Sequence, residues 1–332
     1  MRTIDWRSDE IVIIDQTALP AEERLLHLRT VEELVDAIGR LAVRGAMALG
    51  VAGALGVALA ACRAEEEGAD VRRASEDAAA RLAKARPTAV NLSWGAKRVA
   101  AVAAGGRKAM VAEALRVLEE DVAANRAIGE RGAALLDGRH RILTHCNAGA
   151  LAGTEWGTAL SIIRVLHDRG AISEIFVSET RPLLQGARLT AWELGRMGVP
   201  HRVVVDGAGA GLILAGRVDA VIVGADRIAR NGDVANKVGT VAHALAARRA
   251  GIPFIVAAPE STFDPDTASG AAIAIEERDP NEVLCIGGVR IAPERSGALN
   301  LAFDVTPVDL VTAIVTESRV IYPGIDPILA RP

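Results

Sequence analysis

Aromatic residues, cysteines and excess positive charge are all scarce in this chain of 332 residues. Phe, Trp and Tyr make up 3% of it, which leaves few rings on which the bases of a single-stranded nucleic acid could stack. Lys and Arg number 38 against 42 Asp and Glu, giving a net charge of −4. The sequence lacks the basic surface that a phosphate backbone requires, so we expect no nucleic-acid partner.

Metal and nucleotide motifs are missing as well. Cys62, Cys146 and Cys285 lie far apart, and the 6 histidines form no cluster near them, which argues against zinc. Carboxylates do not group in the way that Mg²⁺ or Mn²⁺ would need. The segment DGAGAGL has no complete G-x-G-x-x-G, and no phosphate-binding G-x-x-x-x-G-K-[ST] occurs. We therefore expect no metal and no cofactor.

The first fifteen residues contain no apolar run typical of a secretory leader, so we expect a cytoplasmic, reduced protein. One stretch, Gly45–Cys62, has no charged residue and is long enough to span a membrane. Most of its residues are Ala and Gly, and no second such stretch accompanies it, which favours a buried core helix. Gly50, Gly53 and Gly56 share one helix face and allow a close backbone approach, although membrane helices also pack this way.

The length suggests two domains, and the two parts of the chain have different patterns. Early residues show a short apolar strand at Ile11–Ile14 and a capping box at Thr30 and Glu33, and Val111–Leu136 has helical spacing. We predict a mainly helical N-terminal domain over residues 1–135.

Short apolar runs alternate with helical patterns in the second part. Five runs are each followed by Gly, Asp, Glu or Pro: Arg141–Thr144, Glu174–Val177, Arg202–Val205, Ala220–Val223 and Phe254–Ala257. Such alternation predicts a parallel sheet covered by helices on both faces. We therefore predict an α/β protein whose domain over residues 136–332 is Rossmann-like, with its ligand site beyond the carboxyl ends of the strands.

Two reactive side chains follow predicted strands. Asp226 comes after the run Ala220–Val223, where partial desolvation would raise the pKa of its carboxyl and suit proton donation; a turn or cap aspartate is the alternative. Cys146 follows Arg141–Thr144, and a helix starting there would lower the pKa of its thiol; a buried filler cysteine is the alternative. His145 points to the opposite face of the strand and is not expected to serve as the base for Cys146.

Cationic and amide side chains indicate anion recognition. Asn236 and Lys237 precede an Ala-rich helix, whose free N–H groups together with the lysine would make a phosphate site. Arg44 opens the Gly/Ala helix, and Arg86 precedes Pro87, which favours an extended backbone at Arg86 and a helix start beyond it. The charged loop 179–188 suits hydroxyl and phosphate recognition, or is an ordinary solvated loop.

Taken in order, several segments resemble one known family. They are VRGAMALG, RPTAVNLSWG, THCNAGALA, SETRPLLQGARLTAWEL, GADRIARNGDVANKVGT, AAPESTFD and IEERDPNEV, and they extend over nearly the whole chain. Together they resemble the methylthioribose-1-phosphate isomerases of methionine salvage, part of the initiation-factor-2B-like group. The resemblance implies a helical domain on a Rossmann-like domain, a homodimer, and conversion of 5-methylthioribose 1-phosphate to 5-methylthioribulose 1-phosphate.

The resemblance also implies residue roles. Asp226 matches the proton donor and Cys146 the second catalytic residue. The substrate-binding set is matched by Arg44, Gly45, Ala46, Arg86, Gln185, Asn236 and Lys237.

Two segments depart from the family pattern. Met47-Ala48-Leu49 stands where Pro-Ala-Ile is usual, and Gly207-Ala208 follows Asp206 where Asn or Ser and Met are usual. Two other functions stay open: a ribose-1,5-bisphosphate isomerase, and a non-catalytic regulatory subunit of the translation initiation exchange complex. The pairing of Cys146 with Asp226 favours an enzyme.

Overall fold

Two compact units make up the chain in the computed structural model, which describes residues 2–86, 89–138 and 140–329. Unit 1 comprises Met1–Ala127 and Ala148–Ser161, and unit 2 comprises Ile128–Asn147 and Ile162–Pro332. The predicted division after residue 135 falls near the first crossing between the units. It did not include the return of residues 148–161 to unit 1, which local sequence patterns do not reveal.

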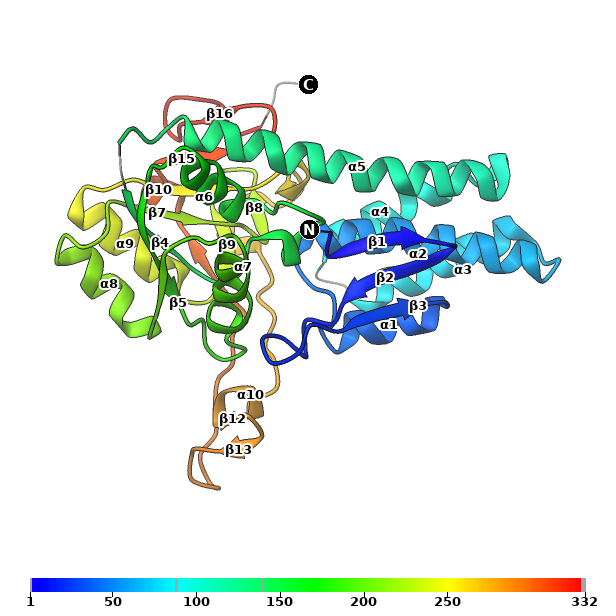
Figure 1. Cartoon of the computed structure of the whole chain (residues 1–332), viewed down its shortest axis with the longest axis horizontal. Coiled ribbons are helices and arrows are strands. Elements are labelled where there is room, and N and C mark those ends of the chain that lie inside the picture. The colour runs from blue at the N-terminus through cyan, green and yellow to red at the C-terminus, as the bar shows by residue number, and fades with distance from the viewer. Residues whose placement is uncertain (1, 87–88, 139, 330–332) are drawn as a thin grey trace. The chain divides into compact units, whose positions relative to one another are not determined.

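Unit 1 combines a small antiparallel sheet with helices (Figure 1). Its elements are β1 (Ile4–Arg7), β2 (Glu10–Ile14), β3 (Leu25–Leu28), α1 (Val31–Gly39), α2 (Ala46–Glu66), α3 (Val71–Ala85), α4 (Val90–Ala100), η1 (Ala103–Gly105), most of α5 (Gly106–Ala133) and η2 (Ala150–Ala152). The predicted strand Ile11–Ile14 is confirmed within β2. The capping box is also confirmed: the Thr30 hydroxyl accepts a hydrogen bond from the Glu33 N–H at 3.2 Å, and the Glu33 carboxylate accepts one from the Thr30 N–H at 3.1 Å.

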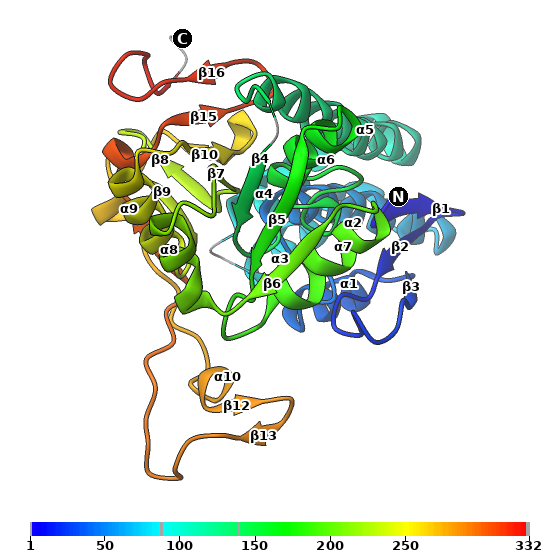
Figure 2. The same cartoon turned by 60° about the vertical axis from the view of Figure 1, so that its left-hand side comes forward.

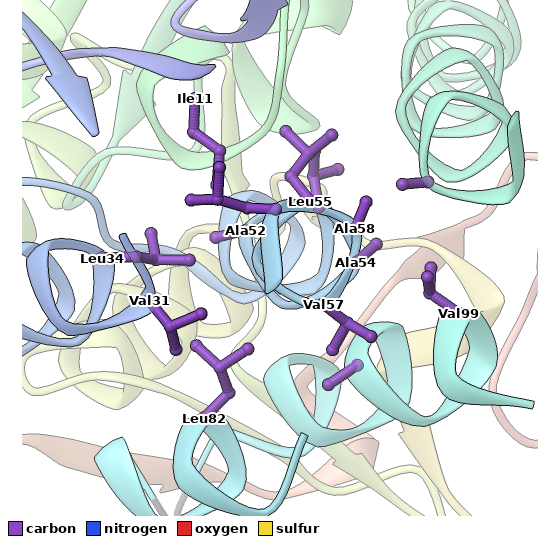
Figure 3. Close-up of a cluster of buried hydrophobic side chains, with 14 of the residues drawn as sticks. Ile11, Val31, Leu34, Ala52, Ala54, Leu55, Val57, Ala58, Leu82 and Val99 are labelled. Carbon is purple, nitrogen blue, oxygen red and sulfur yellow. The ribbon is translucent and has the colours of Figure 1, made fainter. Parts of the chain in front are cut away.

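Helix α2 is the core of unit 1, and its Leu55 and Val57 belong to one buried cluster with Leu34 of α1, Leu82 of α3 and Val99 of α4 (Figure 3). Among the residues that the structure describes, it is the one helix long and apolar enough to cross a membrane, and 83% of its apolar window is buried. Its glycines meet α4: a Cβ on Gly53 would lie 2.3 Å from the Leu92 carbonyl oxygen, and one on Gly95 would lie 2.0 Å from that of Gly50. The predicted buried helix with a close backbone approach is confirmed.

We expect Gly95→Ala to destabilise unit 1 strongly, because the added methyl group meets backbone that has no room to move. Overpacking of this kind costs about 1–3 kcal/mol or more, which urea denaturation of the variant should show as a lower unfolding midpoint. Gly211→Ala is the matched control, since nothing lies within 4 Å of a Cβ at that helical position. Equal midpoints for the two variants would contradict the close helix contact.

Unit 2 is built on a seven-stranded sheet of order β16-β15-β10-β7-β4-β5-β6, parallel except for β16. Its strands are β4 (His140–Thr144), β5 (Ile172–Ser178), β6 (His201–Val204), β7 (Ala220–Val223), β10 (Phe254–Ala257), β15 (Ala313–Val315) and β16 (Val320–Ile321). The five predicted runs are confirmed as β4, β5, β6, β7 and β10. Read in chain order, the six parallel strands lie 6-5-4-1-2-3, which is the Rossmann arrangement.

Helices cover both faces of this sheet. They are α6 (Ala159–Asp168), the π-helical turn η3 (Gly186–Thr190), α7 (Ala191–Arg196), α8 (Asp206–Leu214) and α9 (Thr240–Ala250). Figure 2 shows α8 and α9 together on one face, with α6 and α7 on the other. The predicted fold class is confirmed.

A second sheet, of order β11-β8-β9-β14, extends from the end of β7. Its strands are β8 (Arg227–Ala229), β9 (Val234–Lys237), β11 (Phe263–Asp264) and β14 (Phe303–Thr306). Outside this sheet, the remaining short elements of unit 2 are η4 (Glu260–Thr262), η5 (Gly270–Ala272), α10 (Asn281–Leu284), β12 (Cys285–Ile286), β13 (Val289–Arg290) and η6 (Val308–Leu310). β8 and β9 form a hairpin whose turn uses Gly232 at φ 92°. This hairpin begins one residue after Asp226 and ends at Lys237.

Strand order determines where the predicted catalytic residues lie. β4 and β7 are far apart in sequence but are adjacent and parallel, with Leu143 opposite Val221. They are the two strands between which the strand order reverses, where α/β sheets bind their ligands. Cys146 follows one of them and Asp226 the other, so both lie at the predicted ligand-binding edge of the sheet.

Candidate active site

Cys146 lies in the irregular segment that follows β4 and is half-buried. Its backbone is left-handed, with φ 61°. The expectation that a helix begins here is wrong: described residues 145–149 are not helical, and only the three-residue turn η2 follows. A helix N-terminus therefore does not activate this thiol.

Hydrogen bonds hold the Cys146 backbone on both sides. Its N–H donates to the Thr180 hydroxyl at 2.9 Å, and its carbonyl accepts from the Thr190 hydroxyl at 2.6 Å. Asn147 Nδ2 donates to Thr190 Oγ1 at 3.1 Å and to Glu193 Oε1 at 2.8 Å. The cysteine is thus fixed by residues that follow β5, which sequence reasoning had not singled out.

Asp226 lies in a bend after β7, and its N–H donates to the Ala235 carbonyl at 2.9 Å across the β8–β9 hairpin. The residue is exposed, so the expectation that its own strand would withdraw it from water is wrong. The apolar strand ends at Val223, and the chain then turns outward into the hairpin. A proton-donor role for Asp226 therefore requires that bound substrate shields the carboxyl from water.

Two buried histidines, His145 directly after β4 and His243 in α9, contact each other. His145 Nε2 is 2.8 Å from the Val238 carbonyl oxygen, and its ring contacts that of His243 edge-on with centroids 5.1 Å apart. Burial lowers the pKa of His145, and burial lowers that of His243 to about 3. Both rings are therefore neutral at physiological pH and serve to join β4 to the start of α9.

Asn236 and Lys237 are both buried at the end of β9. Lys237 Nζ donates to the Ala302 carbonyl at 2.7 Å and lies 4.8 Å from the centroid of the Phe303 ring. Asn236 Nδ2 donates to Thr240 Oγ1 at 3.0 Å. These contacts hold both side chains in place. The two partners of the Lys237 ammonium group named here, a backbone carbonyl and an aromatic ring, carry no negative charge.

The predicted phosphate site at the start of α9 needs correction, because Asp304 is already there. Its carboxylate accepts the Gly239 N–H at 2.6 Å and the Val241 N–H at 3.3 Å. β14 pairs antiparallel with β9 and sets Asp304 opposite Asn236, a long-range pairing that no local motif signals. Asp304 therefore occupies the Gly239 and Val241 N–H groups at the start of α9, which are not open to a phosphate.

The charge on Asp304 depends on pH. Burial raises its pKa from 3.8 to about 6, against the lowering effect of the Gly239 and Val241 N–H groups. Because the folded pKa is the higher one, this residue contributes stability that is complete below pH 3.8 and is lost as the pH rises through about 6.

Gln185 lies one residue before the π-helical turn and is buried. Among the described residues, its Oε1 has no hydrogen-bond partner. The turn is pressed against β5, since a Cβ on Gly186 would lie 1.7 Å from the Ser178 carbonyl oxygen. Gln185 thus offers a polar atom from a rigid position, as its predicted substrate-binding role requires.

The remaining predicted residues belong to unit 1. Arg44 is buried, and Gly45 precedes Ala46, the first residue of α2, as predicted. Gly45 has φ 99°, and a Cβ there would lie 2.6 Å from the Ala152 Cα, so only glycine fits. Arg86 has the predicted extended backbone, but it ends α3 and is not at a helix start. The role expected of Pro87 falls outside the described residues.

Comparisons with known proteins agree on one family. A model described as the initiation factor 2 subunit family matches residues 42–323. The 5-deoxyribose 1-phosphate isomerase of Moorella thermoacetica is 52% identical over 96% of this chain and 94% of its own length. The methylthioribose-1-phosphate isomerase of Anaeromyxobacter dehalogenans is 51% identical, over 96% and 92%. A probable bifunctional methylthioribose-1-phosphate isomerase/methylthioribulose-1-phosphate dehydratase of Nocardia farcinica is also 51% identical over 97% of this chain, which spans only 60% of its length.

Solved structures lead to the same family. The 5-methylthioribose 1-phosphate isomerase of Pyrococcus horikoshii is 42% identical with a TM-score of 0.90, covering 97% of this chain and 92% of its own. The translation initiation factor eIF-2B subunit delta from A. fulgidus is 43% identical with a TM-score of 0.88, covering 98% and 96%. The chain belongs to the initiation factor 2 subunit family.

Proposed function

We propose that this chain is an aldose–ketose isomerase that converts 5-methylthioribose 1-phosphate to 5-methylthioribulose 1-phosphate in methionine salvage. The observation that carries the proposal is the placement of Cys146 and Asp226 beyond the adjacent strands β4 and β7, where the strand order reverses. Relatives that are about half identical over nearly the whole chain are named methylthioribose-1-phosphate isomerase.

The chemistry follows from the substrate. Its phosphate is attached to the anomeric carbon C1, so the ring cannot open to a free aldehyde. Asp226 donates a proton to the ring oxygen as the bond from that oxygen to C1 breaks. The Cys146 thiolate then takes the proton from C2 while the Asp226 carboxylate takes the proton of the C2 hydroxyl, giving an enediolate. The C2 proton returns from Cys146 to C1 as the C2 oxygen becomes the ketone. The competing route is a direct hydride shift from C2 to C1 that Cys146 only stabilises.

Substrate binding is assigned residue by residue. In unit 2 we assign Asn236, Lys237 and Gln185, which present buried polar groups from fixed backbone. In unit 1 we assign Arg44, with Gly45 and Ala46 at the start of α2, and Arg86; this list rests on the motifs that these residues match. Unchanged kinetics in Arg86→Ala would remove that residue from the set.

Lys237→Met is expected to lower kcat/KM by about 10- to 100-fold. The methionine keeps the packing on Phe303 but loses the ammonium group, and one charged contact to phosphate contributes about 1.5–3 kcal/mol. Steady-state kinetics of the variant give the measurement. Lys97→Met, at an exposed position on α4, is the control and should match the wild type. Equal kcat/KM in both variants would contradict a phosphate role for Lys237.

The group at C5 of the sugar defines the second candidate. A relative named for 5-deoxyribose 1-phosphate is as similar to this chain as those named for methylthioribose 1-phosphate. Assays of the purified protein with these two sugars and with ribose 1,5-bisphosphate separate the substrates. We expect the highest kcat/KM with methylthioribose 1-phosphate. Turnover of none of them would favour the regulatory-subunit hypothesis, in line with the A. fulgidus structure.

We further propose that the protein is a cytoplasmic homodimer that needs no metal ion. Within the described part of the chain, no three His, Cys, Asp or Glu side chains are grouped as metal ligands. Light scattering without detergent tests the dimer, and recovery in the membrane fraction alone would contradict the location. Activity that EDTA abolishes and a divalent cation restores would overturn the metal-free proposal.

A further inference from the structure

The backbone of Cys146 is held in a conformation that its residue type disfavours. A φ of 61° lies in the left-handed region, where the side chain of any residue except glycine crowds the following carbonyl. Such conformations persist where surrounding contacts determine them, and they are concentrated at functional sites. Glycine would relieve the strain but has no thiol. Surrounding contacts must therefore hold the Cys146 backbone in the left-handed conformation.

Thr180 supplies the contact on the amide side. Its hydroxyl accepts the Cys146 N–H at 2.9 Å and donates to the Ser178 carbonyl at 2.9 Å, so both the donor and an acceptor site of this fully buried group are used. Thr180 is itself left-handed, with φ 68°. Two strained residues, one after β4 and one after β5, are thus joined by one hydrogen bond.

Asp206, the first residue of α8, holds Thr180 in turn. One carboxylate oxygen accepts the Thr180 N–H at 2.8 Å, and the other accepts the Arg181 N–H at 2.7 Å. On the far side, the Thr180 carbonyl accepts the Leu184 N–H at 2.7 Å. Hydrogen bonds therefore run from the end of β6 through Thr180 to the Cys146 amide, and none of these side chains needs to touch the substrate.

We propose that Thr180, held by Asp206, is a positioning residue that fixes Cys146 in its left-handed conformation and so aims the thiol at the reacting sugar. The inference rests on the proposed isomerase function. It extends that function to two residues with no assigned role. The departures from the family pattern at Gly207 and Ala208 lie in the first turn of α8 and leave the Asp206 carboxylate unchanged; nothing lies within 4 Å of a Cβ at Gly207.

Thr180→Val tests the proposal, because valine keeps the branched shape and loses only the hydroxyl. Amide hydrogen exchange at Cys146 should become at least about tenfold faster, since its acceptor is gone. The kcat should fall at least about tenfold while KM stays within about threefold, because the thiol is misplaced and substrate contacts remain. Thr180→Ser restores the hydroxyl and should recover kcat to within about threefold of wild type.

Two further variants keep the test decisive. Thr306→Val is the matched control: Thr306 is also fully buried in unit 2, and among the described residues its hydroxyl has no partner, so Cys146 exchange and kcat should be unchanged. Asp206→Asn replaces one of the two accepting oxygens by an amide nitrogen and should lower kcat in the same way. It provides the test if Thr180→Val does not fold. Wild-type kcat and Cys146 exchange in Thr180→Val, or in Asp206→Asn, would overturn the proposal.

A readout independent of turnover separates this proposal from the proposed function. The alkylation rate of Cys146 by iodoacetamide, followed by mass spectrometry of its peptide, should change at least about fivefold in Thr180→Val and stay constant in Thr306→Val. Buried Cys62 and half-buried Cys285 serve as internal standards in the same digest. If the wild type isomerises no sugar phosphate in these assays, a changed alkylation rate of Cys146 in Thr180→Val still supports the positioning role of Thr180, and an unchanged rate refutes it.

Discussion

Replacing Cys146 by alanine is expected to lower kcat by roughly 10²- to 10⁴-fold while substrate still binds, which is the contribution of proton transfer by a positioned side chain. The thiol is the reactive group beyond β4, and alanine removes it with little change in shape. Steady-state kinetics give kcat, and equilibrium binding of the sugar phosphate to the variant shows that the site remains intact.

The control for this loss is Cys285→Ala, on the short hairpin β12–β13, which should keep wild-type kinetics. Near wild-type turnover in Cys146→Ala would refute the catalytic assignment. A second variant, Cys146→Gly, should be equally inactive but more stable than Cys146→Ala. Glycine adopts φ 61° without steric cost, whereas alanine at a left-handed position costs about 1–2 kcal/mol.

Deuterium at C2 of the substrate distinguishes the two routes of hydrogen transfer. If Cys146 carries the hydrogen as a proton, part or all of the deuterium should be lost to ordinary water during turnover. Complete retention of deuterium at C1 would favour the hydride shift and would reduce Cys146 to a stabilising role. We expect loss, because a thiolate is a competent base for the C2 proton.

Asp226→Asn is expected to lower kcat by roughly 10²- to 10⁴-fold, the contribution of a general acid. The asparagine keeps the size and the bend after β7 but has no proton to give to the ring oxygen. The exposed position of Asp226 in the free chain adds a second expectation. Because substrate must shield the carboxyl, the high-pH limb of the pH profile, where Asp226 loses its proton, should differ between kcat/KM and kcat, which report the free enzyme and the complex.

Asp266→Asn is the matched control for this variant. Asp266 is an exposed carboxylate of the same unit, and its loss should leave kcat unchanged. Wild-type kcat in Asp226→Asn, or identical pH profiles for kcat and kcat/KM, would contradict the role assigned to Asp226.

Local order in this protein follows from the sequence alone. The runs that became β4, β5, β6, β7 and β10 are short, largely apolar and bounded by turn residues, so they had few alternatives to a strand of a parallel sheet, buried in the centre and exposed at the edge strand β6. The capping box at Thr30 and the glycine face of α2 are likewise local: a cap involves residues within one turn, and glycine spacing alone permits a close helix approach. The motif residues could therefore be placed at strand ends before any tertiary contact was known.

What only the tertiary structure decided is how distant segments meet. Strand order brings β4 beside β7 and so sets Cys146 and Asp226 at the same edge, and pairing of β14 with β9 places Asp304 on the helix end that had been predicted to hold phosphate. The exposure of Asp226 and the left-handed backbone of Cys146 depend in the same way on the hairpin after β7 and on Thr180 after β5. Periodicity reports which side of an element is buried, whereas the partner that buries it is chosen by packing over the whole unit.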